Sequence, residues 1–370
     1  MSEWKEYRLG EVCIYNTERI PLNLLNEENY ISTENMLPNI GGVTISSNLP
    51  TSGNAVHFYN GDILISNIRP YFKKIWYANK EGGCSADVLC IRANKDIDKQ
   101  YLYYLLSQQD FFDYVMAGAK GCKMPRGDKQ HIMNWEISLP SLPTQQKIAN
   151  ILSSLDDKIE VNRRINEQLE ELAQALFKSW FVDFEPFKDG EFVESELGMI
   201  PEGWKVCELS DVLYISKDSI NPSKTPDNLF HHYSIPAYDN NKREEAQEGK
   251  AIMSNKFKVT NKTTLFSKLN PRIKRVWFID NIKENAICST EFVPYKAKNN
   301  ELTYFVYGLI NSDFFYNQAM SIVNGATGSH QRFHPQDTLK FNIAFNESVA
   351  KEYSSIVEPI VSKILVNQQE

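Results

Sequence analysis

The chain has 370 residues and a net charge of −7, and 42% of its residues are hydrophobic and 12% aromatic. These values are typical of a globular protein with two or three domains, and no apolar run approaches the ~18 residues of a membrane span. The first residues lack the apolar segment of a signal peptide, so we expect a cytoplasmic protein without membrane contact. The six cysteines form no CxxC pair and are expected to be reduced, buried thiols.

The negative charge is concentrated in one part of the chain. Residues 141–200 carry 12 acidic and 6 basic side chains, a net charge of −6, whereas residues 201–340 carry 15 acidic and 18 basic ones, a net charge of +3. Near-neutral domains can hold local basic clusters, which is what contact with phosphate needs. The overall charge therefore does not exclude a nucleic-acid partner.

The first 143 residues have the pattern of a strand-rich mixed domain. Short runs rich in β-branched residues, such as "GDILISNI" and "ADVLCIRA", lie between turn signals and predict strands. The later run "YLYYLLSQQDFFDYVM" has helical periodicity. We therefore expect the α+β class.

A long helix is predicted to follow. The stretch "LPSLPTQQ" closes the first domain with two prolines, and Thr144 can cap the helix after it. Neither Pro nor Gly then occurs until Pro186, which leaves a helix of ~40 residues, or ~60 Å at 1.5 Å per residue.

Apolar residues recur along this helix in two series with a step of seven, as in a coiled-coil seam. The last residues of the chain keep the same pattern. The predicted seam consists of Ile148, Leu152, Leu155, Ile159, Asn162, Asn166, Leu169, Val357, Ile360, Ile364 and Asn367. Asparagines are unfavourable in an apolar seam, so we interpret Asn162 and Asn166 as register pins between two helices. The alternative is that they face solvent.

The second half of the chain repeats the first. The opening "WKEYRLGEV" from Trp4 returns as "WKVCELSDV" from Trp204, and "SNIRPYFKKIW" from Ser66 returns as "SKLNPRIKRVW" from Ser267. Further blocks recur in the same order: "CSAD" as "CSTE", "DFF" as "DFF", "GAKG" as "GATG", and the Lys-Ile-x-x-Asn of the long helix at Lys363. A period of about 200 residues indicates a duplicated domain.

The repeat sets the expected boundaries. We predict a first domain over 1–143, a long helix over 144–185, a linker over 186–200, a second domain over 201–345 and a shortened helix over 346–370.

Two basic segments occur in both halves and are candidates for DNA contact. Base reading needs side chains with paired donors or acceptors, and phosphate contact needs cations. The first segment and its repeat hold Asn67, Arg69, Tyr71, Lys73 and Lys74, and Lys268, Asn270, Arg272, Lys274 and Arg275. The second holds Lys120, Lys123, Arg126 and Lys129, and Ser329, His330, Gln331 and Arg332. A third, unrepeated segment holds Lys256, Lys258 and Lys262. The alternative for each is a solvated surface charge.

The sequence holds no convincing catalytic or metal site. No phosphate-binding Gly-rich loop or methyl-donor motif is present. Asp183, Glu185 and Lys188 have the composition of a metal-dependent nuclease site, but their spacing is wrong. His330 and His334 are four residues apart without a third ligand. We therefore predict a non-catalytic chain with no metal and no cofactor of its own.

Three local patterns, together with the duplication, carry a resemblance that covers nearly the whole chain. They are the junction "LPSLPTQQKIANIL", the helix and exit "DDKIEVNRRINEQLEELAQALFKSWFVDFEPF", and the entry to the second domain "GMIPEGWKVCEL". The chain resembles the specificity (S) subunit of type I restriction-modification enzymes. The implied architecture is two similar α/β target-recognition domains, separated by an antiparallel two-helix coiled coil and related by a pseudo-two-fold repeat.

The resemblance also implies a function. Each target-recognition domain reads one half of a bipartite target in double-stranded DNA. The coiled coil sets the gap between the halves and docks two methyltransferase (M) subunits, which restriction (R) subunits can join. S-adenosylmethionine, ATP and Mg are then expected on the partner subunits, which methylate adenine and cut DNA.

Two departures from the family pattern leave alternatives open. The second junction, "NIAFNESVAKEYSSI", lacks the Pro and Gln of the first, and the second helix ends where about 20 residues of the first remain unpaired. The alternatives are the specificity subunit of a related type II system, or a truncated adaptor or decoy that binds M subunits without DNA. Self-association through the unpaired helix is a further expectation.

Overall fold

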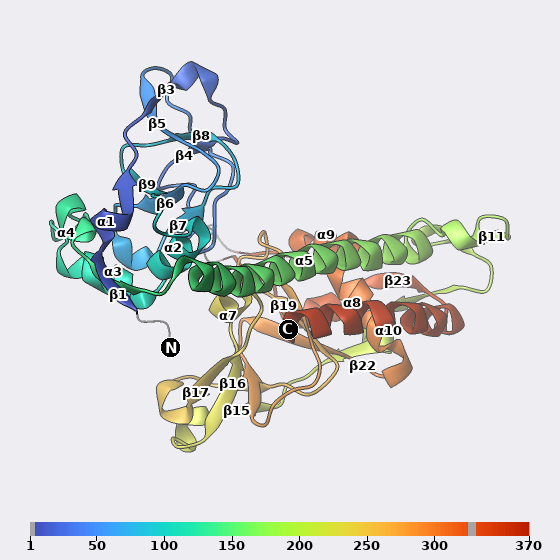
Figure 1. Cartoon of the computed structure of the whole chain (residues 1–370). Coiled ribbons are helices and arrows are strands. Elements are labelled where there is room, and N and C mark those ends of the chain that lie inside the picture. Colours follow the sequence, from blue (N-terminus) through green and yellow to red (C-terminus); the bar gives the residue numbers. More distant parts are fainter. Residues whose placement is uncertain (1–3, 325–330, 370) are drawn as a thin grey trace. The chain divides into compact units, whose positions relative to one another are not determined.

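A computed structural model describes residues 4–324 and 331–369 (Figure 1). The chain divides into two compact units, Met1–Ile159 and Glu160–Glu370, which are described separately. The boundary falls within the long helix, so each unit contains part of it. In the part of the chain that is described, no helix has both the length and the apolar character needed to cross a membrane.

The first unit is built from one strand pair and two four-stranded sheets. The pair joins β1 (Lys5–Arg8) to β10 (Glu136–Leu139). One sheet has the order β2 (Cys13–Tyr15), β9 (Val88–Ala93), β6 (Ile63–Ser66), β7 (Ile75–Tyr77). The other has the order β3 (Arg19–Pro21), β5 (Asn54–Phe58), β8 (Gly82–Cys84), β4 (Tyr30–Ile31), and only its β4–β8 pair is parallel.

Helices pack against the first of these sheets and close the core. They are α1 (Leu9–Val12), α2 (Lys99–Leu106), α3 (Gln109–Ala117) and α4 (Lys129–Met133). Asp98 caps α2, because its carboxylate accepts hydrogen bonds from the backbone N–H groups of Gln100 and Tyr101. The run predicted to be helical over 101–116 is thus two helices. Their buried residues, including Leu102 and Phe111, share a core with Ile63 and Ile91 of the sheet.

The predicted long helix is α5 (Leu142–Phe181), with 40 residues. It begins two residues before Thr144, and Pro143 occupies its first turn, where a missing N–H costs nothing. Gln145 ties this end to the first unit: its side chain donates to the carbonyl of Pro140 and accepts from the N–H of Asp98.

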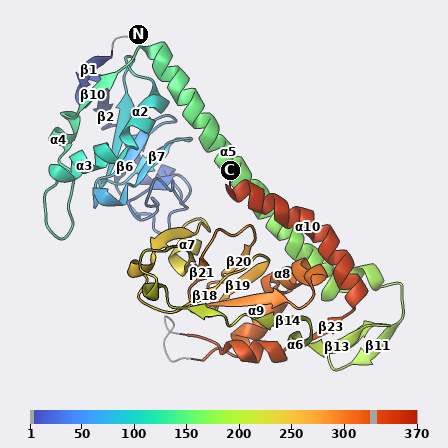
Figure 2. The same ribbon diagram turned by 90° about the horizontal axis from the view of Figure 1, so that it is seen from below.

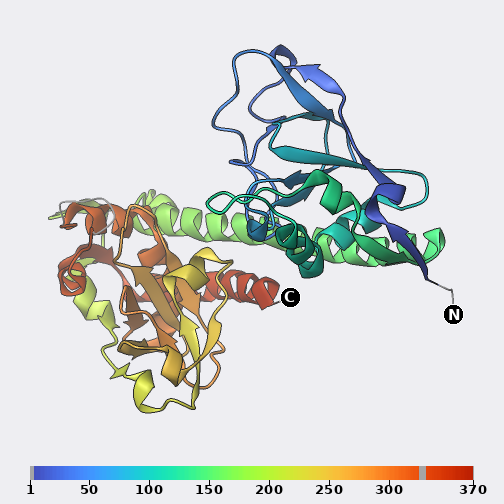
Figure 3. The ribbon, with the colours of Figure 1, turned by 90° about the vertical axis from the view of Figure 1, so that its left-hand side faces the viewer.

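The second unit repeats the strand order of the first, which confirms the duplication. The strand pair is β13 (Lys205–Glu208) with β23 (Asn342–Phe345). The four-stranded sheet has the order β14 (Leu213–Ile215), β22 (Phe292–Ala297), β19 (Thr263–Ser267), β20 (Val276–Ile279). The third sheet has the order β15 (Ser219–Ile220), β18 (Lys256–Lys258), β21 (Ala286–Cys288), β16 (Leu229–Tyr233), β17 (Glu245–Glu248), and β17 has no counterpart in the first unit. These strands form the yellow and orange part of Figure 3.

The helices of the second unit are α6 (Leu209–Val212), α7 (Ile235–Asp239), α8 (Thr303–Asn311), α9 (Asp313–Ser321) and α10 (Glu347–Gln369). Most of them have counterparts in the first unit, but α7 has none, and a 3-10 helix at Pro335–Lys340 stands where the first unit has α4. All nine residues of α8 are buried, since the helix lies between the sheet and the helix pair.

Helix α10 runs alongside the later part of α5 (Figure 2). The Asn166 amide donates to the carbonyl of Ile364 at 3.2 Å and accepts from the Asn367 amide at 2.8 Å. Further on, the Tyr353 hydroxyl donates to the carbonyl of Ala173 at 3.1 Å. Residue numbers that increase along α5 therefore face residue numbers that decrease along α10, which confirms that the two helices are antiparallel.

The predicted seam is only partly formed by this pair. Val357, Ile364 and Asn367 are buried, and Ile360 and Leu169 are half-buried. Leu155 and Ile159 are instead 53% and 47% exposed. Asn162 and Leu152 are half-buried. Ile148 packs against the core of the first unit instead of against a second helix, so its seam assignment is corrected.

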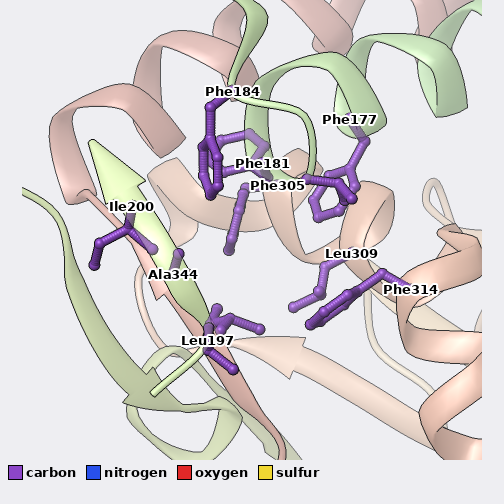
Figure 4. Close-up of a pocket in the computed structure, with 11 residues that line it drawn as sticks. Phe177, Phe181, Phe184, Leu197, Ile200, Phe305, Leu309, Phe314 and Ala344 are labelled. Atoms are coloured by element: carbon purple, nitrogen blue, oxygen red, sulfur yellow. The ribbon is translucent and has the colours of Figure 1, made fainter. Parts of the chain in front are cut away.

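The segment 186–200, predicted as a linker, is folded. A 3-10 turn at Glu185–Phe187 leads into a hairpin of β11 (Phe192–Ser195) and β12 (Gly198–Pro201). The chain here covers an apolar cavity of about 170 Å³ next to the end of α5 (Figure 4). The labelled side chains around it include Phe177, Phe181, Leu197 and Phe314. Phe181 of the helix and Ile200 of the hairpin belong to the same core cluster, so the hairpin packs against the end of α5.

Candidate nucleic-acid interface

The two basic segments of the first unit meet in space. One is the turn after β6, residues 67–74; the other is the glycine loop, residues 118–129. Ile68 forms a β-bridge with Arg126, and the N–H of Arg69 donates to the carbonyl of Pro125 at 2.8 Å. The N–H of Gly127 donates to the carbonyl of Asn67 at 3.2 Å. We call this arrangement the first loop pair.

The second unit builds the same arrangement from the repeated segments. Leu269 forms a β-bridge with Arg332, and the N–H of Asn270 donates to the carbonyl of Gln331 at 2.9 Å. Residues 268–275, with Asn324, Gln331 and Arg332, form the second loop pair. The sequence indicated that these segments recur, but not that they touch. Ser329 and His330 lie outside the described residues.

Both turns are held in an unusual backbone conformation. Arg69 and Asn270 occupy equivalent positions and have φ angles of 50° and 47°, in the left-handed region that non-glycine residues rarely adopt. A serine supports each turn: Ser66 Oγ donates to the carbonyl of Ile68, and Ser267 Oγ donates to that of Leu269. Such strain is common at functional sites.

An acidic residue ties each glycine loop to the sheet, and the sequence search for basic residues missed it. Arg126 pairs with Asp87 at 3.1 Å, and Arg332 pairs with Glu291 through two bonds of 3.0 and 3.1 Å. The hydrogen bonds to Glu291 raise the pKa of Arg332 above its usual value. The sequence contained a signal for these two acids, because Asp87 and Glu291 are the last residues of the repeated blocks "CSAD" and "CSTE".

Two predicted contact residues serve their own domain instead. The Lys74 ammonium donates to the carbonyl of Thr33 at 2.6 Å, and burial lowers its pKa. Arg275 is buried and forms two bonds of 2.7 and 2.9 Å to Asp239. Arg275 is therefore not free to contact DNA, and its prediction is corrected, whereas Lys74 is half-buried with its ammonium bonded inside its own domain.

Two other predicted cations are paired at the surface. Lys274 binds Asp313 at 3.0 Å, and Lys120 binds Asp128 at 2.5 Å. The latter bond is the largest contribution that lowers the pKa of Asp128 to about 2. Surface pairs of this kind are weak and can exchange partners.

The remaining predicted side chains are available at the surface of the two loop pairs. Lys123, Lys129 and Arg272 are exposed, Tyr71 is 48% exposed, and Lys73 and Lys268 are half-buried. None of these cations forms an ion pair with any residue that the structure describes. The buried atoms Asn67 Oδ1, Arg69 Nε and Gln331 Oε1 have no hydrogen-bond partner. Each loop pair thus combines free cations with unsatisfied polar groups.

The three lysines of the third basic segment lie in three different environments. Lys256 is buried, and its pKa is lowered by that burial. Lys258 pairs with Asp218 at 3.2 Å, and Lys262 lies 5.9 Å from the centre of the Tyr304 ring. These three residues do not form one basic surface.

The carboxylates considered for catalysis are paired with neighbouring lysines. Asp183 binds Lys178, and Glu185 binds Lys188 at 2.6 Å. Over residues 4–324 and 331–369, no group of three or more His, Cys, Asp or Glu side chains is placed to hold a metal ion.

The described residues thus contain a mixed domain twice, and in each copy a strained turn is bridged to an arginine of a second segment. Residues 1–171 match the family described as the type I restriction modification DNA specificity domain. The first 171 residues thus belong to this family, and the chain is similar over most of its length to a specificity subunit of a type I restriction enzyme.

Individual relatives agree with this assignment. The chain is 31% identical over 286 residues to the type I restriction enzyme MjaIX specificity subunit of Methanocaldococcus jannaschii, covering 73% of this chain and 64% of that one. It is 34% identical over 196 residues to the HindI specificity subunit of Haemophilus influenzae, covering 51% and 43%. The chain thus spans less than two thirds of either relative.

The fold has a solved counterpart. The S subunit of the type I system of M. genitalium superposes with a TM-score of 0.61 at 13% identity, covering 100% of this chain and 92% of that one. At this identity the likeness shows the fold alone.

Proposed function

We propose that this chain is the DNA-reading component of a type I restriction-modification complex. The observation that carries the proposal is the loop pair, which occurs twice. In each unit a strained turn and a glycine loop are tied together and present basic side chains. Cations and backbone amides at such loops contact phosphates, and Arg, Asn and Gln side chains read base edges.

The two loop pairs differ in the side chains that they present. The first offers Lys120, Lys123 and Lys129 around Arg126, whereas the second offers Gln331 beside Arg332. Two domains with one fold and different loop chemistry suit two different half-sites. We therefore propose a bipartite target whose halves differ in sequence.

Partner subunits would bind along the helices. In the first unit, α5 exposes Ile151, Leu155 and Ile159 by 63%, 53% and 47%, more apolar area than a solvated helix face usually carries. This face supports the proposal that two methyltransferase subunits dock there, with restriction subunits joining the complex. That the coiled coil sets the gap between half-sites stays a prediction from the family.

The chain itself would supply no chemistry. Its two carboxylates at the helix exit, Asp183 and Glu185, are each paired with a lysine. S-adenosylmethionine, ATP and Mg would bind to partner subunits.

The test is a methylation map. The chain is expressed with its methyltransferase subunit in a host that lacks adenine methylation, and modified bases are mapped across the genome. We expect a gapped motif with a methylated adenine in each half. A single ungapped motif would contradict the two-domain reading. Absence of methylation with the methyltransferase still bound would favour an adaptor or decoy.

A salt titration tests DNA contact directly. Because each neutralised phosphate releases counterions, the logarithm of DNA affinity is expected to fall steeply with the logarithm of salt concentration. A flat dependence would argue against phosphate contact by the loop pairs.

A further inference from the structure

The second unit contains a polar pocket that the DNA-contact residues do not account for. Its volume is about 410 Å³, and it opens beside the second loop pair, since Leu269 and Glu291 belong to its wall. Ile235 and Pro236 also line it and make part of the wall apolar. The polar side chains that line it include His232 and Lys256.

His232 offers an acceptor that has no partner. Gln247 Nε2 donates to Glu245 at 3.1 Å, which orients the amide so that its Oε1 accepts from His232 Nδ1 at 3.0 Å. The proton therefore lies on Nδ1, and Nε2 keeps a free lone pair. This Nε2 is buried without a hydrogen-bond partner, and His232 is only 9% exposed. Desolvation also lowers the pKa of His232, which favours the neutral ring.

Lys256 offers donors that are only partly used. The residue is 7% exposed, and its ammonium donates to Ser254 Oγ at 2.6 Å and to the Ser254 carbonyl at 3.4 Å. No carboxylate pairs with it among the residues that the structure describes. An ammonium has three N–H donors, and burying one without a counter-ion is unfavourable. A ligand acceptor would supply the missing interaction.

The fold does not require these polar groups. Strand pairing shows which residues of the first unit are equivalent to these two. Tyr30 is equivalent to His232, because it pairs with Gly83 as His232 pairs with Ile287. Ala55 is equivalent to Lys256, because each directly precedes the residue that pairs with the cysteine of the next strand. Tyr30 and Ala55 belong to an apolar cluster with Leu22 and Leu25. The matching sheet face is thus wholly an apolar cluster in the first unit, whereas in the second unit a smaller cluster of Phe230, Ile252 and Ile287 leaves room for polar groups beside it.

We propose that this pocket binds a nucleobase. A base presents N–H donors and ring-nitrogen or carbonyl acceptors along one edge, which match His232 Nε2 and the Lys256 ammonium, and its flat faces match Ile235, Pro236 and Leu269. The lining holds one cation, Lys256, and two carboxylates, Glu245 and Glu291. Glu291 is paired with Arg332, which lies outside the lining, so the pocket has no excess of positive charge and a neutral ligand is favoured over a phosphate.

The base could come from two sources. One is an unstacked base of bound DNA, and this source rests on the proposed function, since Leu269 and Glu291 join the pocket to the second loop pair. The other is a free nucleoside. The chemistry of the pocket is the same for both, and two experiments separate them.

The first experiment measures saturation transfer by NMR from the full-length chain to each of the four deoxynucleosides. We expect transfer to at least one nucleoside, its loss in Lys256→Met and in His232→Phe, and its retention in Lys258→Met. Lys258 is a matched control, because it lies on the same strand but pairs with Asp218 outside the pocket. Lys256→Met removes a buried charge, so its melting temperature should not fall; His232→Phe keeps the ring and provides a second test.

The second experiment places 2-aminopurine at each position of the half-site that the methylation map assigns to the second unit. Its fluorescence rises when the base leaves the stack. For DNA as the source, we expect a several-fold rise at one position, lost in Lys256→Met and kept in Lys258→Met. Nucleoside transfer without such a rise would assign the pocket to a free nucleoside.

Three results would overturn the proposal. They are no response in either experiment, an equal loss in Lys258→Met, or a response that persists in both pocket variants. The nucleoside experiment does not depend on DNA binding. It therefore tests the pocket even if the chain binds no DNA and the proposed function is wrong.

Discussion

The two units share a backbone arrangement and differ in what it carries. Both tie a glycine loop to the sheet through one arginine and one acid, Arg126 with Asp87 and Arg332 with Glu291. The side chains that the described parts of the loops offer, such as Lys123 in the first unit and Gln331 in the second, and one face of the third sheet are chemically different. A duplicated fold can thus keep the hydrogen bonds that hold its loops while changing the side chains that read a partner. Four predictions test where this separation holds.

The largest effect is expected from making the first unit resemble the second at one core position. Gly83 stands where the second unit has Ile287, and a Cβ there would lie 2.9 Å from Ala55 Cβ and closer still to Leu25. Gly83→Ile should lower the free energy of unfolding of the first unit by about 3 kcal/mol through overpacking. Urea unfolding followed by hydrogen exchange of β8 peptides measures it. Ile287→Val should lower the free energy of unfolding of the second unit by only about 1 kcal/mol. Equal losses in the two variants would contradict the difference in packing between the two units.

The next effect concerns the loop arginines and DNA. Because Arg126 and Arg332 hold their loops through Asp87 and Glu291, Arg126→Gln should weaken recognition of one half of the target and Arg332→Gln that of the other, each by about 1–3 kcal/mol. Competition binding against single-base variants of the target measures both. Arg19→Gln removes an exposed arginine on β3 of the first unit, away from the loop pair, and serves as the control. Weakened recognition of the same half by both loop variants would contradict the assignment of one half-site to each unit.

A smaller effect is expected at the helix pair. Asn367→Ala leaves the half-buried Asn166 side chain without one hydrogen-bond partner and should lower the free energy of unfolding by about 1–2 kcal/mol. Replacing both asparagines by Leu should recover most of this loss, because no unsatisfied amide remains. A double-mutant cycle in urea measures the coupling. Additive losses would show that the two amides do not interact.

The smallest effect is a difference in pH dependence at one shared sheet position. Burial lowers the pKa of His232 below 6.5 and raises the pKa of Tyr30 above 10.0. As pH falls below about 6.5, the unfolded His232 binds a proton that the folded one resists, so the second unit should lose stability on the acid side. As pH rises above about 10, the unfolded Tyr30 loses its proton first, so the first unit should lose stability on the alkaline side.

Hydrogen exchange between pH 5 and 10.5 reports on each unit separately. His232→Phe should remove the acid-side loss, and Tyr30→Phe the alkaline one. An acid-side loss that is unchanged in His232→Phe would assign it to other groups that titrate on folding.

The duplication, the long helix and the basic segments could all be predicted from the sequence, because each depends on local pattern. Repeated blocks keep their order, and α5 follows from 40 residues whose interior contains no glycine and only one proline, at its first turn. The predicted linker at 186–200 was different: Ile200 of its hairpin belongs to a core cluster with residues distant in sequence, such as Phe305 and Phe345, and local composition does not reveal this.

Only the tertiary structure decided which predicted residues act together. Lys74 and Arg275 matched the pattern of DNA contacts, but Thr33 and Asp239 engage them from elsewhere in the chain. The acids Asp87 and Glu291, and the pocket of His232 and Lys256, arise where strands far apart in sequence are hydrogen-bonded neighbours. A sequence determines its periodicities and repeats by itself, whereas burial and charge pairing depend on which distant segments the fold brings within a few ångströms.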